Sequence, residues 1–494
     1  MICVSIGRGR HRHVIAEHKH LVEQGAKLVE LRLDYINGQI NLKRLLVDRP
    51  GPVIITIRRP QDGGKYNGTE QERLVLLRTA IADGVDYVDL EEDVAASIPR
   101  YGKTKRIVSM HDFRKTPEDL EVIHARLAKL DPDIVKISTL ANQPHDNLRM
   151  LRLVKQSKIP TVGICMGDIG TPSRLLAGRC GAPFSYATFH HERTLAPGQL
   201  SFQQMTEIYD YDNITSQTEV YGVIGDPIAQ SLSPIIHNAA FRALKLNKVY
   251  IPFRIPREDL NSFLDDAEEL GIKGLSVTIP HKEAVLKRVA KIDGAVRGIM
   301  AANTLVFGED GLASYNTDYR GAMDCLTSAL TNERGDADLA TKVALVLGAG
   351  GAAKAIAFGL QRRGAEVVIA SRTRERADKL AAALGCKAVD WGTRHNFWVD
   401  VLVNCTPVGM HPNVDESPYD KHYLKPSMVV FDTVYNPEST LLVKDARARS
   451  CTVVTGVDMF IRQAALQFKH FTDQDASQEL MRDVLKRTIG PAKH

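Results

Sequence analysis

The chain has 494 residues, a length that predicts two to four domains. Hydrophobic residues make up 44% and charged residues 25%, and the net charge of +5 is too mild for a nucleic-acid surface, although it suits a protein that binds small anions. No apolar run approaches the roughly twenty residues of a membrane span, so we expect no membrane partner.

The cysteines and histidines predict no metal site. The seven cysteines are scattered without CxxC spacing, which predicts buried thiols in a reducing compartment. The histidines of "RGRHRHVIAEHKH" lack companions at ligand spacing, so a solvated helix is the better interpretation. Because the chain opens on the strand-like "ICVSI", we expect no signal or transit peptide and a cytoplasmic location. A plastid is the alternative, if a plant transit peptide has been removed.

Short strand-like runs recur through about residue 205 and predict a parallel sheet. Eight such runs occupy residues 2–6, 28–33, 53–57, 86–90, 106–110, 134–138, 161–165 and 184–188. Amphipathic stretches such as "PEDLEVIHARLAKL" separate several of them. Strands that alternate with helices form right-handed parallel units, and eight of them predict a closed (β/α)8 TIM barrel over residues 1–205. A doubly wound open sheet is the alternative.

Charged residues gather at the ends of these runs, where a barrel places its active site. They are Glu30, Arg32, Arg58, His111, Lys136 and Arg174. Each one alone is more easily explained as a salt bridge or a solvated loop residue. Lys136 is the most unusual, since it interrupts the β-branched run "DIVKIS". Together these residues predict a site at one end of the barrel.

A nucleotide-binding domain is predicted after two polar breaks. Residues 206–218 lack periodicity and predict a linker, and a second break covers 331–341. A buried strand (343–347) then runs into a glycine turn, a helix and a second strand (366–370). Here Gly348-x-Gly350-x-x-Ala353 matches the dinucleotide fingerprint, in which glycines allow a tight turn and the approach of a pyrophosphate to a helix N-terminus. The sequence therefore predicts a Rossmann domain.

The end of the second strand favours NADP over NAD. It reads Ser371-Arg372-Thr373, with Arg376 beyond, where an NAD enzyme typically offers a carboxylate. Hydroxyls and a guanidinium suit a 2′-phosphate instead. The alternative is that these arginines only solvate a helix start. The residues expected to bind the cofactor are Gly348, Ala349, Gly350, Gly351, Ala352, Ser371, Arg372, Thr373, Arg376, Thr406, Thr433 and Gly456.

The order of short motifs resembles two known families. Residues 218–494 resemble shikimate dehydrogenase through "SLSP" (231–234), "SVTIPHK" (276–282), "AANT" (301–304), "NTD" (316–318), "NCTPVGM" (404–410), "YNP" (435–437) and "GVDMFIRQ" (456–463). Residues 1–205 resemble type I 3-dehydroquinate dehydratase through "ELR" (30–32), "TIR" (56–58), "SMHDF" (109–113), "DIVKIS" (133–138) and "APGQ" (196–199). The combination resembles the fused dehydratase–dehydrogenase of the shikimate pathway. It implies dehydration of 3-dehydroquinate, followed by NADPH-dependent reduction of 3-dehydroshikimate to shikimate, so the expected partners are these small molecules.

For the first half, the resemblance implies that Lys136 forms a Schiff base with the substrate and that His111 is the general acid/base. Since attack needs a free amine, we expect the pocket to disfavour the ammonium by desolvation or by neighbouring cations. The implied substrate contacts are Ser5, Glu30, Arg32, Arg58, Arg174 and Gln199. Asp62 and Leu195 stand where the family often has Glu and Ser. They leave open an alternative in which only the dehydrogenase works and the barrel is structural or regulatory.

For the second half, the resemblance implies that Lys282 and Asp318 are the catalytic pair. Without the family they read as a helix-start lysine and a helix cap. The implied substrate contacts are Ser231, Ser233, Thr278, Asn303, Tyr435 and Gln463. We expect a substrate domain at 219–322, the Rossmann domain at 323–455, and helices at 456–494 that return to the substrate domain. A non-enzymatic NADP-binding sensor is the remaining alternative.

Overall fold

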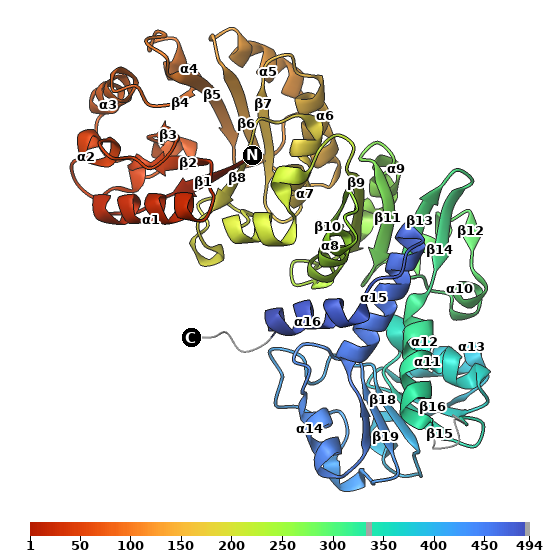
Figure 1. The fold of residues 1–494 in the computed structure, drawn as a ribbon. Coiled ribbons are helices and arrows are strands. Elements are labelled where there is room, and N and C mark those ends of the chain that lie inside the picture. The colour runs from red at the N-terminus through yellow and green to blue at the C-terminus, as the bar shows by residue number, and fades with distance from the viewer. Residues whose placement is uncertain (332–337, 490–494) are drawn as a thin grey trace. The chain divides into compact units, whose positions relative to one another are not determined.

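The computed structural model describes residues 1–331 and 338–489, which form two compact units (Figure 1). The first unit holds Met1–Gly222, Pro227–Pro234 and Asn247–Ile272, and the second holds Val223–Asp226, Ile235–Leu246 and the chain from Lys273 onward. The polar break expected at 331–341 lies partly outside the described residues. Among those described, no helix is long and apolar enough to cross a membrane.

Eight parallel strands form the sheet of the first unit, red to yellow in Figure 1. They are β1 (Ile2–Ile6), β2 (Leu28–Arg32), β3 (Val53–Thr56), β4 (Tyr87–Glu91), β5 (Lys105–Asp112), β6 (Ile134–Leu140), β7 (Thr161–Met166) and β8 (Ser185–Thr188). Each predicted run overlaps one of these strands. The strands follow chain order from β7 back to β1, and β1 also pairs with β8, which curls the sheet into a barrel. The barrel is near-closed rather than closed, because no ladder joins β7 to β8 in the part of the chain described.

Helices between the strands surround the barrel. They are α1 (His11–Glu23), α2 (Leu42–Leu46), α3 (Glu70–Ala82), α4 (Glu92–Ala95), α5 (Leu120–Ala128), α6 (His145–Gln156) and α7 (Thr171–Leu176). Thr69 and Glu72 start α3 with a capping box, which satisfies two backbone N–H groups. Residues 206–218, expected to be a linker, contain helical turns at Gln204–Ile208 and Tyr211–Asn213. Tyr209, Tyr211 and Ile214 are buried there, so this segment is packed rather than extended.

A mixed sheet of six strands follows in the order β10-β9-β11-β13-β14-β12. Its strands are β9 (Glu219–Gly225), β10 (Lys248–Arg254), β11 (Ile272–Val277), β12 (Lys291–Ile292), β13 (Thr304–Gly308) and β14 (Gly311–Tyr315). The helices of this region are α8 (Ser233–Ala243), α9 (Leu260–Asp266), α10 (Gly294–Ile299) and α11 (Thr317–Leu330).

A third sheet is wholly parallel, in the order β17-β16-β15-β18-β19-β20. Its strands are β15 (Val343–Leu347), β16 (Glu366–Ser371), β17 (Lys387–Asp390), β18 (Val401–Asn404), β19 (Val429–Asp432) and β20 (Thr452–Val454). The intervening helices are α12 (Gly351–Arg362), α13 (Arg374–Leu384) and α14 (Leu441–Ala448). The strand order reverses direction at β15, which is the arrangement of the predicted Rossmann fold.

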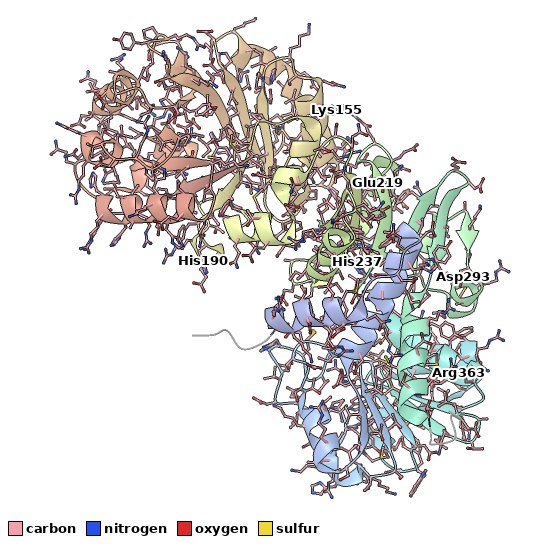
Figure 2. All side chains as sticks on the ribbon, viewed as in Figure 1. Lys155, His190, Glu219, His237, Asp293 and Arg363 are labelled. Atoms are coloured by element: carbon pink, nitrogen blue, oxygen red, sulfur yellow. The ribbon has the colours of Figure 1, made fainter. Side chains whose placement is uncertain are left out.

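The chain ends in α15 (Gly456–Thr472) and α16 (Gln478–Ile489), and α15 packs along α11. The ring of His237, labelled in Figure 2, stacks on Phe468 of α15 with centroids 6.3 Å apart. Gln467 of the same helix donates to the carbonyl of Asn303 at 3.0 Å. The final helices therefore contact α8 and the start of β13.

Candidate active sites

The interior of the barrel changes from apolar to polar along its strands. Cys3, Leu28, Ile54, Ile107 and Ile134 belong to one buried apolar cluster. Two residues further along the same strands stand Ser5, Glu30, Thr56, Ser109 and Lys136, all buried. Because alternate residues of a strand point to the same face, this second layer also points into the barrel. The lysine in the β-branched run therefore faces the axis, and the apolar layer below holds its strand in place.

Two carboxylates lie beside the amine of Lys136. Its Nζ lies 3.0 Å from Asp89 Oδ2 and 3.8 Å from Glu30 Oε1. The ring of Tyr186 lies beneath it, with the centroid 4.1 Å from Nζ. Lys136 is buried, as one of the two expected causes requires, and two acidic groups lie beside its amine.

Asp89 was missed from the sequence. It accepts hydrogen bonds from Arg58 Nη2 at 2.8 Å and Ser109 Oγ at 2.6 Å, in addition to Lys136. Burial alone would raise the pKa of Asp89, but Arg58 and Lys136 outweigh it and hold the pKa well below its ordinary value. Asp89 is therefore ionised beneath the amine. The pattern Tyr87-x-Asp89 in the fourth strand was the available signal, because it places the carboxylate on the inward face.

Asp89→Asn is expected to lower the free energy of unfolding by about 2–3 kcal/mol, because Arg58 and Lys136 lose their shared buried counter-charge. Urea denaturation measures this change. Asp131→Asn is the control, since its partner Arg100 is partly exposed and that pair adds little. Equal stability of the Asp89 and Asp131 variants would contradict the buried-network explanation.

Every residue assigned to the dehydratase site lines one pocket. The pocket is bounded by Ser5, Glu30, Arg32, Arg58, His111, Lys136, Arg174 and Gln199, with Asp62, Phe113 and Leu195 also in its wall. The polar groups of Ser5 and Glu30 are already joined, since Ser5 Oγ donates to Glu30 Oε2 at 2.5 Å. Arg32 is held by both oxygens of Asp34, at 2.9 and 2.8 Å. The structure thus brings the predicted set together.

Arg174 differs from the other arginines of the pocket. Its guanidinium is 2% exposed and donates to the carbonyl of Pro197 at 3.3 Å, while its Nε has no hydrogen-bond partner among the described residues. Burial lowers the pKa of Arg174 to about 10. Arg58, by contrast, is bound to Asp89 and Glu91. Arg174 is therefore the cation best placed to take a ligand carboxylate.

The two departures from the family pattern lie in the pocket wall. Asp62 pairs with Arg59 at 2.7 Å, which directs its carboxylate to that guanidinium. The backbone N–H of Leu195 donates to Gln199 Oε1 at 2.9 Å, so this residue orients Gln199 through its main chain. The Leu195 side chain itself offers no polar contact.

His111 is held as a neutral imidazole. Burial lowers its pKa well below the ordinary value, and the charges of Arg58 and Lys136 lower it further. Its ring is nearly parallel to that of Phe113, with centroids 6.1 Å apart and an interplanar angle of 13°. A neutral imidazole beside Lys136 is able to accept a proton at neutral pH.

The acid limb of the dehydratase pH profile is therefore expected below about pH 6.5, the ordinary pKa of histidine. Because the folded protein keeps His111 neutral where the unfolded chain is protonated, the same group makes stability fall as pH drops below that value. Initial rates from pH 4.5 to 8 measure the limb, with His111→Ala as the variant that should lack it. A midpoint above pH 6.5 that depends on His111 would contradict the buried environment.

In the second unit, Lys282 and Asp318 form a direct pair. Lys282 Nζ donates to Asp318 Oδ2 at 2.5 Å, and Asp318 lies in the first turn of α11. The neighbouring Thr317 N–H donates to Asn303 Oδ1 at 2.8 Å. Asn303 Nδ2 in turn lies 3.4 Å from Gln463 Oε1. Four of the residues predicted for the dehydrogenase site therefore form two pairs, which are brought together by the consecutive residues Thr317 and Asp318.

The other predicted dehydrogenase residues are placed as follows. Thr278 belongs to the loop that carries Lys282, and its carbonyl accepts from the His281 N–H at 2.9 Å. Tyr435 stacks on Phe460, with ring centroids 4.5 Å apart. Ser231 and Ser233 lie at the start of α8 in the first unit. Thr278, Tyr435 and the network around Asp318 belong to the second unit.

Gln467 and Ser276 were not anticipated. Ser276 Oγ donates to Gln467 Oε1 at 2.8 Å, and Gln467 Nε2 donates to the carbonyl of Asn303 and to Thr304 Oγ1, both at 3.0 Å. Gln467 therefore fixes the backbone that carries Asn303. Its position four residues after Gln463 on one helix places both amides on the same face, which was the available signal.

The glycine turn has the shape that a dinucleotide needs. Gly348 has φ +108°, and a Cβ there would lie 2.9 Å from the carbonyl oxygen of Cys405. A Cβ on Gly350 would meet nothing within 4 Å, so there is room above the N-terminus of α12 for a pyrophosphate. A Cβ on Gly351 would lie 3.0 Å from Lys282 Cδ. The turn and Lys282 are therefore neighbours.

The arginines that follow β16 differ in whether a carboxylate pairs with them. Arg374 is bound by Asp378 at 2.8 Å and Asp390 at 3.0 Å. Arg372 and Arg376 are exposed and make no ion pair within residues 1–331 and 338–489. Thr373 N–H donates to Ser371 Oγ at 3.3 Å, which shapes the turn between strand and helix. Arg372 and Arg376 therefore fit a 2′-phosphate at the strand end.

The remaining predicted cofactor residues lie at the ends of the neighbouring strands. The backbone N–H and hydroxyl of Thr406 donate to Asn404 Oδ1, at 2.9 and 2.7 Å. Thr433 Oγ1 donates to the Asn404 carbonyl at 2.8 Å. A Cβ on Gly456 would lie 2.3 Å from the carbonyl oxygen of Val434, so only glycine fits there. These positions share the sheet edge with the glycine turn.

Comparisons with known proteins match both halves. The family model for type I 3-dehydroquinase matches residues 2–216, and that for the shikimate dehydrogenase substrate binding domain matches 223–305. An NADP oxidoreductase (coenzyme F420-dependent) model matches 342–433, and the shikimate 5'-dehydrogenase C-terminal domain matches 456–486.

Relatives of known identity cover the whole chain or its second half. A bifunctional 3-dehydroquinate dehydratase/shikimate dehydrogenase from Arabidopsis thaliana chloroplasts is 38% identical over 99% of this chain and 84% of its own length. A crystal structure of shikimate dehydrogenase with NADP+ is 37% identical and covers 56% of this chain and 98% of its own, with a TM-score of 0.52. The Thermus thermophilus enzyme, crystallised with NADP(H) and shikimate, is 32% identical and covers 55% and 99%, with a TM-score of 0.50.

Proposed function

Because the chain belongs to the family of bifunctional 3-dehydroquinate dehydratases/shikimate dehydrogenases, we propose that it catalyses both reactions in sequence. The barrel dehydrates 3-dehydroquinate, and the second half reduces the product, 3-dehydroshikimate, to shikimate with NADPH. The observation that supports this best is that every residue assigned to the dehydratase lines one pocket around Lys136. A barrel kept only for structure would not need an ionised buried network beneath its lysine.

In the dehydratase, the amine of Lys136 attacks the ketone and forms a Schiff base as the ketone oxygen leaves as water. The iminium accepts the electron pair left when the neighbouring carbon loses a proton, and hydrolysis of the product iminium releases 3-dehydroshikimate and restores the amine. His111 takes that proton and returns one to the departing hydroxyl as water leaves. Arg174 binds the substrate carboxylate, and Glu30 and Gln199 orient its hydroxyls. Asp89 and Glu30 stabilise the positive charge of the iminium at Nζ, because they lie within 4 Å of it.

In the dehydrogenase, bound NADPH supplies the hydride. Lys282 donates a proton to the ketone oxygen, and Asp318 orients its ammonium. The substrate hydroxyls are bound by Asn303, Gln463 and Thr278. The substrate carboxylate is bound by Ser231 and Ser233, and Tyr435 is a further substrate contact. The turn Gly348–Ala352 holds the pyrophosphate, and Ser371, Arg372, Thr373 and Arg376 hold the 2′-phosphate. Thr406, Thr433 and Gly456 would also contact the bound cofactor.

We propose the domain division expected from the sequence, with a barrel at 1–205, a substrate domain at 219–322, a Rossmann domain at 323–455 and returning helices at 456–494.

The partners of the protein are its small-molecule substrates. All seven cysteines are free, which supports a reducing compartment. We propose the cytoplasm, with a plastid as the alternative that the chloroplast relative supports.

A coupled assay tests the proposed function. Purified protein is given 3-dehydroquinate and NADPH, and nicotinamide absorbance is followed while shikimate is identified by mass spectrometry. We expect NADPH consumption that depends on 3-dehydroquinate. Reduction of 3-dehydroshikimate without consumption of 3-dehydroquinate would restrict the function to the second half.

Arg372→Asp is expected to raise the KM for NADPH by about tenfold to a hundredfold, because it replaces a charge-assisted contact to phosphate with repulsion. The KM for NADH should change by less than that for NADPH. Arg374→Asp is the matched control, since Arg374 already pairs with Asp378 and Asp390. An unchanged preference for NADPH in the Arg372 variant would contradict the assignment.

A further inference from the structure

A contact surface within the first unit joins the barrel to the first elements of the dehydrogenase half. The barrel contributes α6 and residues 167–173, which run from the end of β7 into the first turn of α7. The dehydrogenase half contributes β10, α9 and the turn up to Gly271. All of these residues belong to the first compact unit. We call this surface the docking face.

The centre of the docking face is apolar. A small cavity there is lined mainly by apolar residues, namely Pro144, Ile169, Pro172, Phe253, Ile255, Phe263 and Leu270, with Asn147 and Arg254 also in its wall. Phe253 and Phe263 are each 2% exposed, and their rings pack together with centroids 5.1 Å apart. Burial of such side chains supplies most of the free energy of a contact of this kind.

The rim of the docking face is complementary in charge. Arg152 of α6 donates from Nε and Nη2 to the two oxygens of Glu269, at 2.8 and 2.7 Å. His145 Nδ1 lies 2.8 Å from Asp266 Oδ2. Arg152 holds the pKa of Glu269 below its ordinary value, and Lys155, labelled in Figure 2, adds to this effect. Arg152 and His145 of α6 thus pair with Glu269, which follows α9, and with Asp266, the last residue of α9.

Hydrogen bonds connect the docking face to residues of the dehydratase pocket. Asn147 of α6 donates to the carbonyl of Ile169 at 2.8 Å and accepts from the Ser173 N–H at 3.2 Å. The Gly167 N–H donates to the carbonyl of Pro197 at 3.1 Å. Arg174, which follows the segment, donates to the same carbonyl at 3.3 Å. Residues 167–173 therefore support both Arg174 and the loop that ends at Gln199.

We propose that the dehydrogenase half, docked through β10 and α9, holds residues 167–173 in the position in which Arg174 and Gln199 bind the dehydratase substrate. The second half then has a positioning role in the first reaction, separate from its own chemistry. This inference rests on the proposed substrate roles of Arg174 and Gln199. Those roles are tested separately by Arg174→Ala, which should raise the dehydratase KM without loosening the docking face.

Charge reversal in the full-length protein tests the proposal. Arg152→Glu places two carboxylates together at the rim, and Arg152→Glu with Glu269→Arg restores the pair with the charges exchanged. The measurements are dehydratase KM and kcat for 3-dehydroquinate, and hydrogen exchange of the peptides that cover 167–173 and 260–270. Arg100→Glu is the matched control, because Arg100 and Arg152 are both 39% exposed and both pair with carboxylates.

We expect Arg152→Glu to raise KM about threefold to tenfold with kcat changed less than twofold, and to speed exchange in both peptides. The charge-exchanged variant should return both measurements towards wild type, and Arg100→Glu should leave them unchanged. Faster exchange at 260–270 with an unchanged KM overturns the proposal, as does a raised KM that Glu269→Arg fails to reverse. Unchanged exchange and unchanged KM in Arg152→Glu overturn it too, because the docking face then does not position residues 167–173.

Discussion

Lys136→Met is expected to lower the dehydratase kcat about ten-thousandfold, because the Schiff base is the only electron sink that the barrel offers in this mechanism. Methionine has a similar length and no amine, and Asp89 keeps Arg58 and Ser109 as partners, so the fold should survive. Borohydride added with 3-dehydroquinate should attach substrate mass to the wild-type chain at residue 136. The variant should take up no mass.

The dehydrogenase step of the same variant should keep its wild-type rate with 3-dehydroshikimate. Lys105→Met is the matched control, since Lys105 is an exposed lysine at the start of the neighbouring strand β5. Trapped mass at another lysine, or full dehydratase activity in Lys136→Met, would remove Lys136 from the mechanism and leave the barrel without an assigned nucleophile.

Lys282→Met is expected to lower the dehydrogenase kcat about a hundredfold to ten-thousandfold, because the ketone oxygen loses its proton donor. Asp318→Asn should have a smaller effect of the same kind, since it removes the carboxylate that orients the ammonium at 2.5 Å. The double variant should be little worse than Lys282→Met alone, because the two side chains act as one unit. Steady-state kinetics with 3-dehydroshikimate and NADPH measure all three.

The surface pair Lys291–Asp310 provides the control for this experiment, since Lys291→Met removes an exposed lysine that also bonds a carboxylate, at 2.6 Å. It should leave both reactions unchanged. Dehydratase rates should also stay at the wild-type level in Lys282→Met. Additive losses in the double variant would show that Lys282 and Asp318 have independent roles.

Much of the fold could be predicted from local pattern. Each of the eight strand-like runs overlaps a barrel strand, and the glycine turn after residue 347 opens α12 as expected. The expected gathering of charged residues at one end of the barrel is also seen, since they line a single pocket. The near-closed rather than closed sheet and the packed residues 206–218 differ from expectation, because both depend on contacts between distant segments.

The partners of the catalytic residues could not be predicted in the same way. Lys136 and Asp89 are 47 residues apart, and Ser276 and Gln467 are 191 apart. Their side chains meet because strands in register and a returning helix bring them together, which no window of sequence contains. Asp62 and Leu195 illustrate the same limit, since the sequence marks them as unusual but only the fold shows that one pairs with Arg59 and the other orients Gln199.

The sequence by itself indicated the residues that we propose carry the chemistry and the elements on which they stand, because family motifs point to the residues and spacing along a strand or helix fixes the face on which each one lies. The tertiary structure alone decided the charge environment. It placed two carboxylates beside Lys136, left Arg174 with a free Nε among the described residues, and set residues 167–173 against β10 and α9. The reason is physical: electrostatic interactions depend on distance and burial in space, and these are set by packing rather than by order along the chain.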